Sequence, residues 1–148
     1  MNEGMLIVYT GQGPEREMPS LGLLVRSAGY GKKGCIIDFG NGSSDPERRS
    51  AEIMGDSVDI FPQTNAPLTV EDAWNTAKTV IREGSHQLVI LRGLPKASAS
   101  GRIPEQDMRD CLAHLPPDVN VIVVGNSACR PLIDLADVVT DVREISPR

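Results

Sequence analysis

The sequence is poor in aromatic residues, cysteine and long apolar runs. Phe, Trp and Tyr make up 3% of its 148 residues, so a planar ligand would find few side chains to stack against. The three cysteines, Cys35, Cys111 and Cys129, are widely spaced and odd in number, which argues against a disulfide framework and a zinc site. No apolar run approaches the ~20 residues of a membrane-spanning helix, and the first residues lack a signal-peptide pattern. We therefore expect a cytoplasmic protein without a membrane partner.

Basic residues are also the minority. The 15 Lys and Arg against 20 Asp and Glu give a formal net charge of −5, which argues against nucleic acid or an anionic membrane as a partner. The chain is long enough to bury a core without disulfides or metals, and no repeat or linker divides it. We expect one domain over residues 1–148.

What the chain does contain is a regular alternation of two kinds of apolar segment. Short, nearly continuous apolar runs predict strands at 5–9, 34–39, 58–61, 87–91, 119–124 and 138–142. Apolar residues at helical spacing predict helices that begin near Pro19, Pro46, Thr69, Pro104 and Pro131. The first of these places Leu21, Leu24, Val25 and Ala28 on one face, whereas the small-residue segment 95–101 is predicted to be a mobile loop. The alternation indicates a three-layer α/β fold with a mostly parallel sheet of at least five strands and helices on both faces.

A glycine-rich turn follows the first predicted strand, with the sequence Thr-Gly-Gln-Gly-Pro-Glu-Arg-Glu-Met-Pro-Ser at residues 10–20. In a phosphate-binding loop, backbone N–H groups and a lysine hold the phosphates, and a Ser or Thr hydroxyl holds Mg²⁺. Here Pro14 has no N–H, Glu15 and Glu17 add negative charge, and no Lys-Ser/Thr pair follows. Carboxylates ~4 Å from a triphosphate would oppose binding by about 4 kcal/mol at an effective dielectric near 20, of which Arg16 offsets a part. The alternative is that Glu17 binds Mg²⁺ directly.

Two blocks of the sequence resemble the ATP:corrinoid adenosyltransferases of cobalamin metabolism. The first follows the pattern Y-T-G-x-G-K-G-K-T-T-A-A-x-G-x-x-x-R-A-x-G-x-G and then a strand ending Q-F-x-K-G; its matches are Tyr9, Thr10, Gly11, Gly13, Leu21, Gly22, Leu23, Arg26, Ala28, Gly29, Gly31, Phe39 and Gly42. The second, residues 132–141, is similar to the signature L-I-E-x-A-D-L-V-T-E-M and includes Asp137, Thr140 and Asp141. The resemblance implies a fold like that of P-loop NTPases, a homodimer, and ATP, Mg²⁺ and a corrinoid as ligands.

The departures from this pattern fall on its catalytic positions. The family's third loop glycine falls on Glu15, its lysine on Arg16 and its threonines on Glu17 and Met18. The acidic pair that ends its central strand and serves metal and water falls on Arg92-Gly93, and its T-G-R turn falls on residues 124–126 (Val-Gly-Asn). The degenerate nucleotide-binding positions are therefore Thr10, Gly11, Gly13, Arg16 and Glu17. The family's helical stretch before the first strand helps to cover the corrinoid, and only residues 1–4 precede that strand here, so a corrinoid would be held more openly.

Other candidate residues have simple structural explanations. Trp74, at helical spacing among apolar residues, is expected in the core, and His86 is expected on a surface loop. His114 falls in the last turn of a helix, where a cation suits the dipole. Asp137 either contributes to function or caps a turn, and Ser98 and Ser100 have no histidine partner apparent in the sequence. The turn at residues 40–44 either binds a small anion or is only a loop.

Three functions remain open. The first is a degenerate relative of the adenosyltransferases, a pseudoenzyme with weak or no ATP binding that acts as a binding or interaction protein. The second is an active enzyme that transfers the 5′-deoxyadenosyl group of ATP to a Co(I) corrinoid, and the third is a subunit of a larger complex on the same scaffold. We expect the first, because glycine and apolar positions match the family whereas catalytic positions do not, and we assign no catalytic residue and no metal ligand.

Overall fold

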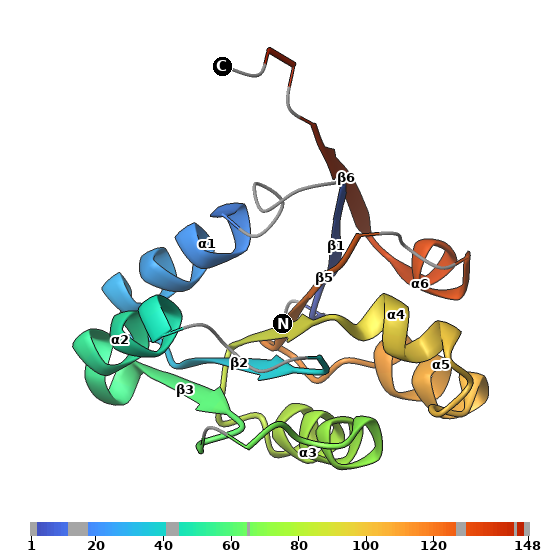
Figure 1. Ribbon diagram of the computed structural model, residues 1–148, viewed down its shortest axis with the longest axis horizontal. Helices are drawn as coiled ribbons and strands as arrows, with labels where there is room; N and C mark the ends of the chain where they lie inside the picture. Colours follow the sequence, from blue (N-terminus) through green and yellow to red (C-terminus); the bar gives the residue numbers. More distant parts are fainter. Residues whose placement is uncertain are drawn as a thin grey trace.

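The computed structural model describes residues 3–11, 18–40, 45–64, 66–126, 130–143 and 145–146. Six strands form one sheet in the order β3-β2-β4-β5-β1-β6, and every neighbouring pair is parallel (Figure 1). The strands are β1 (Leu6–Gly11), β2 (Gly34–Asp38), β3 (Val58–Phe61), β4 (Leu88–Arg92), β5 (Asn120–Val124) and β6 (Val138–Val142). The helices are α1 (Met18–Gly29), α2 (Asp45–Met54), α3 (Val70–Glu83), α4 (Leu94–Ala99), α5 (Glu105–Ala113) and α6 (Arg130–Leu135), with a short 3-10 helix η2 (Gly55–Ser57). The predicted parallel sheet is confirmed.

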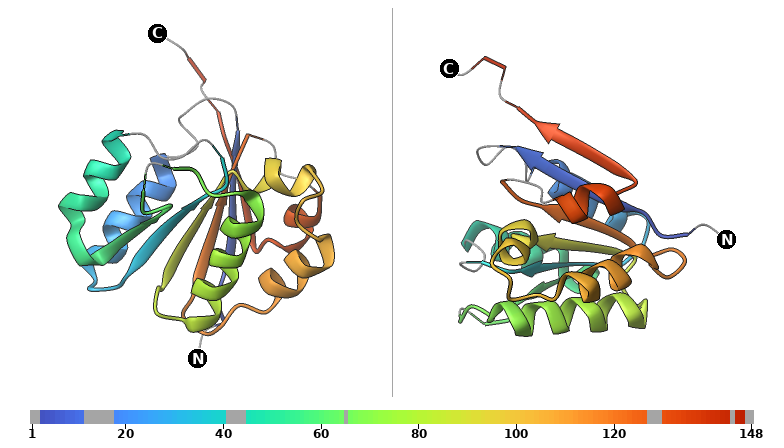
Figure 2. Two further views of the ribbon diagram at one scale, coloured as in Figure 1. Left: turned by 60° about the horizontal axis from the view of Figure 1, so that its bottom comes forward. Right: turned by 90° about the vertical axis from the view of Figure 1, so that its right-hand side faces the viewer.

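Helices cover both faces of this sheet (Figure 2). One face packs against α1 and α2, and the other against α3, α4, α5 and α6. Because successive side chains of a strand point to opposite faces, Cys35 and Ile37 of β2 join the core under α3, and Ile36 joins the core under α1. All residues of β2 are buried, as expected for a strand covered on both sides.

Helix α3 follows the sequence pattern closely. The Thr69 hydroxyl accepts a hydrogen bond from the Asp72 N–H at 3.1 Å, which caps the first turn. Gly84 ends the helix in the left-handed conformation, with φ 69°. Trp74 is buried in the stripe between them, and its Nε1 donates to Asp107 at 2.8 Å, which confirms the predicted core position.

Two predictions about the helices were wrong. Residues 94–99 form helix α4 and not a loop, because Leu94 and Ala97 are buried in the core while Gly93, at φ 85°, turns the chain into the helix. Val25 is 60% exposed, although it lies in the stripe predicted to face inward. Leu24 is the fully buried residue of that stripe, with Leu21 partly buried beside it. The missing side chain of Gly34 on β2 leaves room for Leu24.

The two ends of the sheet differ in how well they are covered. At one end, Val58 and Ile60 of β3 are buried beneath α2. At the other end, Val138 and Val139 of β6 are 42% and 43% exposed. No helix in the described part of the chain is both long and apolar enough to span a membrane.

Candidate functional site

The carboxyl edge of the sheet is the candidate site, because open α/β sheets bind ligands there. Strand β1 reaches this edge between β5 and β6, ends at Thr10 and Gly11, and is followed by α1 from Met18. The predicted strand and the helix that follows it are therefore in place. Gly13, Arg16 and Glu17 lie outside the residues that the structure describes, so the predicted loop positions stay a prediction.

Backbone contacts hold the end of β1 close to its neighbours. A Cβ atom on Gly11, whose φ is 137°, would collide with the carbonyl oxygen of Val142 on β6. On the other side, the Thr10 hydroxyl lies 3.5 Å from the carbonyl oxygen of Asn126, the residue at the third position of the family's T-G-R turn. Packing of β1 against β6 therefore requires a glycine at position 11. The contact of Thr10 with Asn126 brings the end of β1 next to the segment that matches the family's T-G-R turn.

An ion pair lies at this edge where β2 and β4 end side by side. Asp38 and Arg92 are register partners, and Arg92 Nη2 donates to Asp38 Oδ2 at 3.1 Å. Asp38 Oδ1 accepts from the Gly40 N–H at 2.9 Å. The side chains of Asp38 and Arg92 are 5% and 15% exposed. A buried carboxylate is tolerated here because a cation and a backbone donor satisfy both of its oxygens.

Position 93, next to Arg92, is a glycine where the family pattern has the second acidic residue. Its φ of 85° is the left-handed conformation that glycine adopts without strain. Its N–H donates to the carbonyl oxygen of Val124 on β5 at 2.9 Å. A Cβ atom at this position would have the Cβ of Phe39 as its nearest neighbour, at 3.7 Å, which is an ordinary contact. The backbone conformation, and not crowding, thus favours glycine.

The described residues at this edge do not fit Mg²⁺. A divalent cation takes carboxylate oxygens as ligands, and both oxygens of Asp38 are engaged by Arg92 and Gly40. The guanidinium of Arg92 adds a positive charge at the position where the family pattern has a carboxylate. Within the described ranges, no group of three His, Cys, Asp or Glu side chains could hold a metal ion. We therefore derive no chemistry through a metal at this edge.

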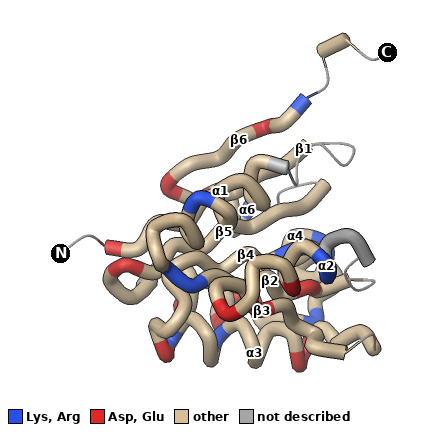
Figure 3. Tube along the Cα trace, turned by 90° about the vertical axis from the view of Figure 1, so that its left-hand side faces the viewer, with Lys and Arg blue, Asp and Glu red and all other residues tan. Residues whose placement is uncertain are grey.

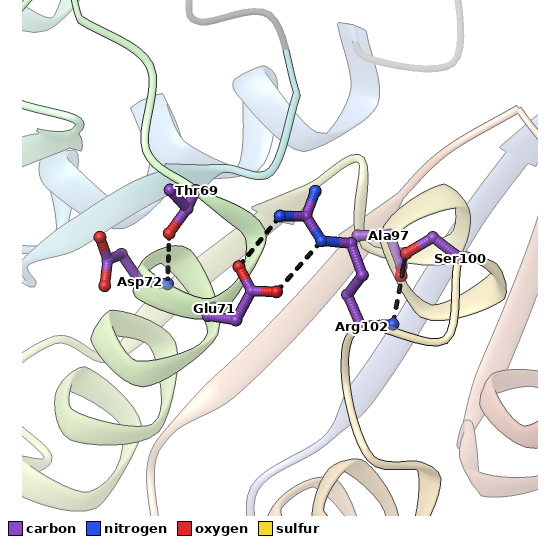
Figure 4. Close-up of polar contacts among 6 residues, drawn as sticks. All are labelled: Thr69, Glu71, Asp72, Ala97, Ser100 and Arg102. Atoms are coloured by element: carbon purple, nitrogen blue, oxygen red, sulfur yellow. Dashed lines mark hydrogen bonds and ion pairs between the residues drawn. The ribbon is translucent and has the colours of Figure 1, made fainter.

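A second, exposed ion pair links the start of α3 to the turn after α4 (Figure 4). Arg102 binds Glu71 through two parallel contacts, Nε to Oε1 at 3.1 Å and Nη2 to Oε2 at 3.2 Å. The pKa of Glu71 is lowered, first by its own backbone N–H and then by Arg102.

Beside this ion pair, the Ser100 hydroxyl donates to the Ala97 carbonyl at 2.6 Å and accepts from the Arg102 N–H at 3.4 Å. Ser100 therefore closes the end of α4, and these bonds leave it in a structural role.

The family-signature residues do not gather at the carboxyl edge. Arg26 lies in the last turn of α1, 5.8 Å from the Tyr30 ring centroid. Asp137 lies beside the start of β1, where its Oδ2 accepts from the Leu6 N–H at 2.8 Å and its own N–H donates to the Leu6 carbonyl. Of the two interpretations of Asp137, this geometry supports the structural one. Thr140 sits in the middle of β6, opposite Tyr9. Asp141 alone lies near the end of β6, beside Thr10, and binds Arg143 at 2.8 Å.

A polar cluster that sequence reasoning missed lies at the opposite, amino edge. His86 is 7% exposed and not on a surface loop as predicted, because its Nε2 binds Asp59 Oδ2 at 2.7 Å. Lys33 Nζ lies 3.5 Å from the same oxygen. Partial burial acts to raise the pKa of Asp59, but the hydrogen bond from His86 and the charge of Lys33 outweigh it and leave that pKa below its usual value of 3.8. The sequence signal was a single acid, Asp59, in an apolar strand.

Cys35, which is fully buried, is the register partner of Asp59 in this cluster. Burial, and then the negative charge of Asp59, raise the pKa of Cys35 to about 12, against a smaller lowering by Lys33. Burial also raises the pKa of Cys111, to about 11. Both shifts favour the protonated thiol near neutral pH, which argues against Cys35 and Cys111 as nucleophiles in the folded protein.

Comparison with known proteins agrees with the resemblance. The family model for ATP:corrinoid adenosyltransferase BtuR/CobO/CobP matches residues 2–147. The corrinoid adenosyltransferase of Escherichia coli K12 is 25% identical over 152 aligned residues, which span 96% of this chain and 78% of the relative. The corrinoid adenosyltransferase CobA of Salmonella typhimurium is also 25% identical, over 96% of this chain and 78% of its own.

Among solved structures, the KaiC-like protein PH0186 of Pyrococcus horikoshii OT3 superposes with a TM-score of 0.62 at 17% identity, over 99% of this chain and 76% of that one. This likeness supports the fold alone, a P-loop-type α/β architecture. The match of the family model over nearly the whole sequence is the stronger finding. The chain belongs to the ATP:corrinoid adenosyltransferase family.

Proposed function

We propose that this member of the family does not transfer an adenosyl group and serves instead as a binding or interaction protein with weak or no affinity for ATP. The observation that supports the proposal is the buried ion pair of Asp38 and Arg92. It places a cation where the family pattern has an acidic pair for metal and water. The sequence of the loop adds to it, because Pro14 has no N–H for a phosphate contact, Glu15 adds negative charge, and Glu17 replaces the hydroxyl that holds Mg²⁺.

A corrinoid, or another small molecule at the carboxyl edge, is the ligand class that the proposal retains. Family membership supports a corrinoid, and the scarcity of aromatic residues argues for loose binding of such a ligand. We further propose a cytoplasmic protein with one domain over residues 1–148, in keeping with the composition. The net charge of −5 favours neither nucleic acid nor an anionic membrane as a partner.

Calorimetric titration tests this function directly. Mg·ATP should bind with a Kd weaker than about 1 mM, equivalent to less than about 4 kcal/mol. Hydroxocobalamin should be titrated in parallel, and formation of adenosylcobalamin from ATP and reduced corrinoid should be followed by absorbance. Micromolar binding of Mg·ATP together with turnover would identify an active adenosyltransferase and overturn the proposal.

A reversal variant separates the loss of contacts from the loss of loop shape. Changing residues 14–17 together to Lys, Gly, Lys and Thr restores the family pattern of the loop. If the backbone still forms a phosphate cradle, the affinity for Mg·ATP should rise at least tenfold over that of the unmodified protein. A second variant that combines this loop with Arg92→Asp removes the cation at the carboxyl edge and should raise the affinity further. Circular dichroism should show that both variants are folded, because Arg92 pairs with the buried Asp38. Failure of both folded variants would mean that the loop no longer adopts a phosphate-binding shape.

A further inference from the structure

The polar cluster at the amino edge of the sheet continues from Asp59 and His86 to a hydroxyl group. The Ser85 Oγ lies 3.2 Å from His86 Nδ1, and His86 Nε2 lies 2.7 Å from Asp59 Oδ2. Serine, histidine and aspartate therefore form one hydrogen-bonded row with the imidazole in the middle. Ser85 is exposed, whereas His86 is 7% exposed. The hydroxyl is thus the end of the row that a molecule from solvent can reach.

The carboxylate of Asp59 determines which hydrogen bonds the imidazole can make. The pKa of Asp59 lies below its usual value of 3.8, so near neutral pH this group is ionised and only accepts hydrogen bonds. His86 Nε2 must then carry the hydrogen of the 2.7 Å contact. In the neutral imidazole, Nδ1 keeps a lone pair, which accepts the hydrogen of the Ser85 hydroxyl. Serine hydrolases activate their nucleophile through the same three groups, with the two ring nitrogens in exchanged positions.

Backbone contacts and strand pairing hold this row in place. The Gln87 N–H donates to the Lys33 carbonyl at 2.8 Å, and Gln87 Oε1 accepts from the Lys33 N–H at 2.9 Å. These bonds join the segment that carries Ser85 and His86 to the start of β2. Asp59 lies on β3, which pairs with the other side of β2. Figure 3 views the molecule from the side on which β2 and β3 lie, and basic and acidic residues are interspersed there.

We propose that Ser85 is a nucleophile that takes up the acyl group of a small activated ester, with His86 as its general base and Asp59 as a positioning residue. In the first step, the Oγ–H proton passes to His86 Nδ1, a bond forms between Oγ and the acyl carbon, and the bond from that carbon to the leaving oxygen breaks. The proton then passes to the departing oxygen. In the second step, water gives a proton to His86 and attacks the acyl-serine, which releases the carboxylic acid and returns the proton to Oγ. Neither ATP nor a corrinoid takes part.

Backbone donors beside the hydroxyl support this chemistry. In the described part of the chain, the N–H groups of Ser85 and His86 donate to no protein acceptor. In serine hydrolases, the N–H of the nucleophile or of the residue after it stabilises the oxyanion that develops on the acyl group. The substrate class follows from exposure: an acyl group on Ser85 would lie at the surface, which favours a small, activated ester over a large substrate held by many contacts.

Acetylation by p-nitrophenyl acetate tests the nucleophile. The wild type should release p-nitrophenolate in an initial burst, and mass spectrometry of the quenched protein should locate the acetyl group on Ser85. Ser85→Ala should abolish this label and lower the rate at least tenfold. Ser100→Ala is the matched control, because Ser100 is also exposed but its hydroxyl donates to the Ala97 carbonyl; rate and label should not change. An acetyl group found only on lysine, cysteine or His114, or an unchanged rate in Ser85→Ala, would overturn the proposal.

The dependence of the acetylation rate on pH tests the roles of His86 and Asp59. The rate should rise as His86 loses its proton. Lys33 Nζ lies 3.5 Å from Asp59 Oδ2 and opposes a positive charge on the imidazole, so Lys33→Met should move the midpoint of this rise to higher pH. Asp59→Asn should move it to lower pH and reduce the plateau at least tenfold. Lys32→Met, at a neighbouring exposed lysine, is the control and should change neither. If circular dichroism shows folded variants and Asp59→Asn and Lys33→Met keep the wild-type profile, the row does not activate Ser85 and the proposal fails.

Discussion

Replacing Arg92 by methionine should destabilise the protein markedly, because it removes the counter-charge of a buried carboxylate. The side chain of Asp38 is 5% exposed and lies 3.1 Å from Arg92 Nη2. After the substitution, one of its oxygens would still accept from the Gly40 N–H at 2.9 Å. The other oxygen would lose its charged donor in a site with little access to water.

The magnitude follows from the depth of the pair. At 3.1 Å and an effective dielectric near 20, the two charges attract by about 5 kcal/mol. Breaking a buried pair by removing one partner costs about 3–5 kcal/mol. At about 2–4 °C per kcal/mol for a domain of this size, the Tm should fall by about 6–20 °C. The exposed pair of Arg102 and Glu71, with side chains 54% and 51% exposed, should contribute less than about 1 kcal/mol.

Urea denaturation of a double-mutant cycle provides the assay. The variants are Arg92→Met, Asp38→Asn and their combination, with Arg102→Met as the exposed control. The double variant should cost at least about 2 kcal/mol less than the sum of the single variants, because it no longer buries an unpaired charge. If Arg92→Met cost no more than Arg102→Met, or if the two single effects simply added, the ion pair would not stabilise the carboxyl edge.

Three further results are expected. Asp59→Asn should cost about 1–3 kcal/mol at pH 7, because it weakens the hydrogen bond that holds the buried His86. Because the pKa of Asp59 lies below 3.8 in the folded protein, Asp59 stabilises the fold above about pH 4, and this stabilisation is lost as the pH falls through the folded pKa. In urea titrations, the free energy of unfolding should therefore decrease less on acidification in the variant than in the wild type. Cys35, with a pKa of about 12, should react with DTNB at pH 8 only after unfolding in urea; rapid reaction of the native thiol would contradict its burial. Gly11→Ala should lower the Tm because of its clash and its φ of 137°, whereas Gly22→Ala, with open space around a helical position, should raise stability by about 0.5–1 kcal/mol.

Periodicity was enough to predict most of the fold. The limits of β3 and β6 agree with their apolar runs, and the cap at Thr69 follows from local hydrogen bonding that the sequence itself encodes. Helix α4 was missed because small residues and proline also occur in loops. What makes that segment helical is the burial of Leu94 and Ala97 in a core that only the tertiary structure creates.

The candidate site was predictable in part. The pattern alone indicated that Arg92 takes the place of an acid, but its partner Asp38 is 54 positions away and becomes its neighbour only through the register of β2 and β4. The same holds for His86 and Asp59, which are 27 positions apart. Sequence reasoning identified residue types that suit chemistry, whereas pairing across strands determined which of them meet. The loop at residues 12–17 lies outside the described part, so its role stays a prediction.

The close approach of β1 to β6 changes what a motif glycine can be taken to mean. Gly11 has no space for a side chain because the Val142 carbonyl lies against it, with no ligand involved. A protein with this sheet would need glycine there even if it never encountered a nucleotide. A sequence motif that counts this glycine as evidence for phosphate binding therefore counts a requirement of strand packing. On this fold, the lysine and the hydroxyl of the loop are the residues that distinguish a nucleotide-binding protein from a relative that has lost nucleotide binding.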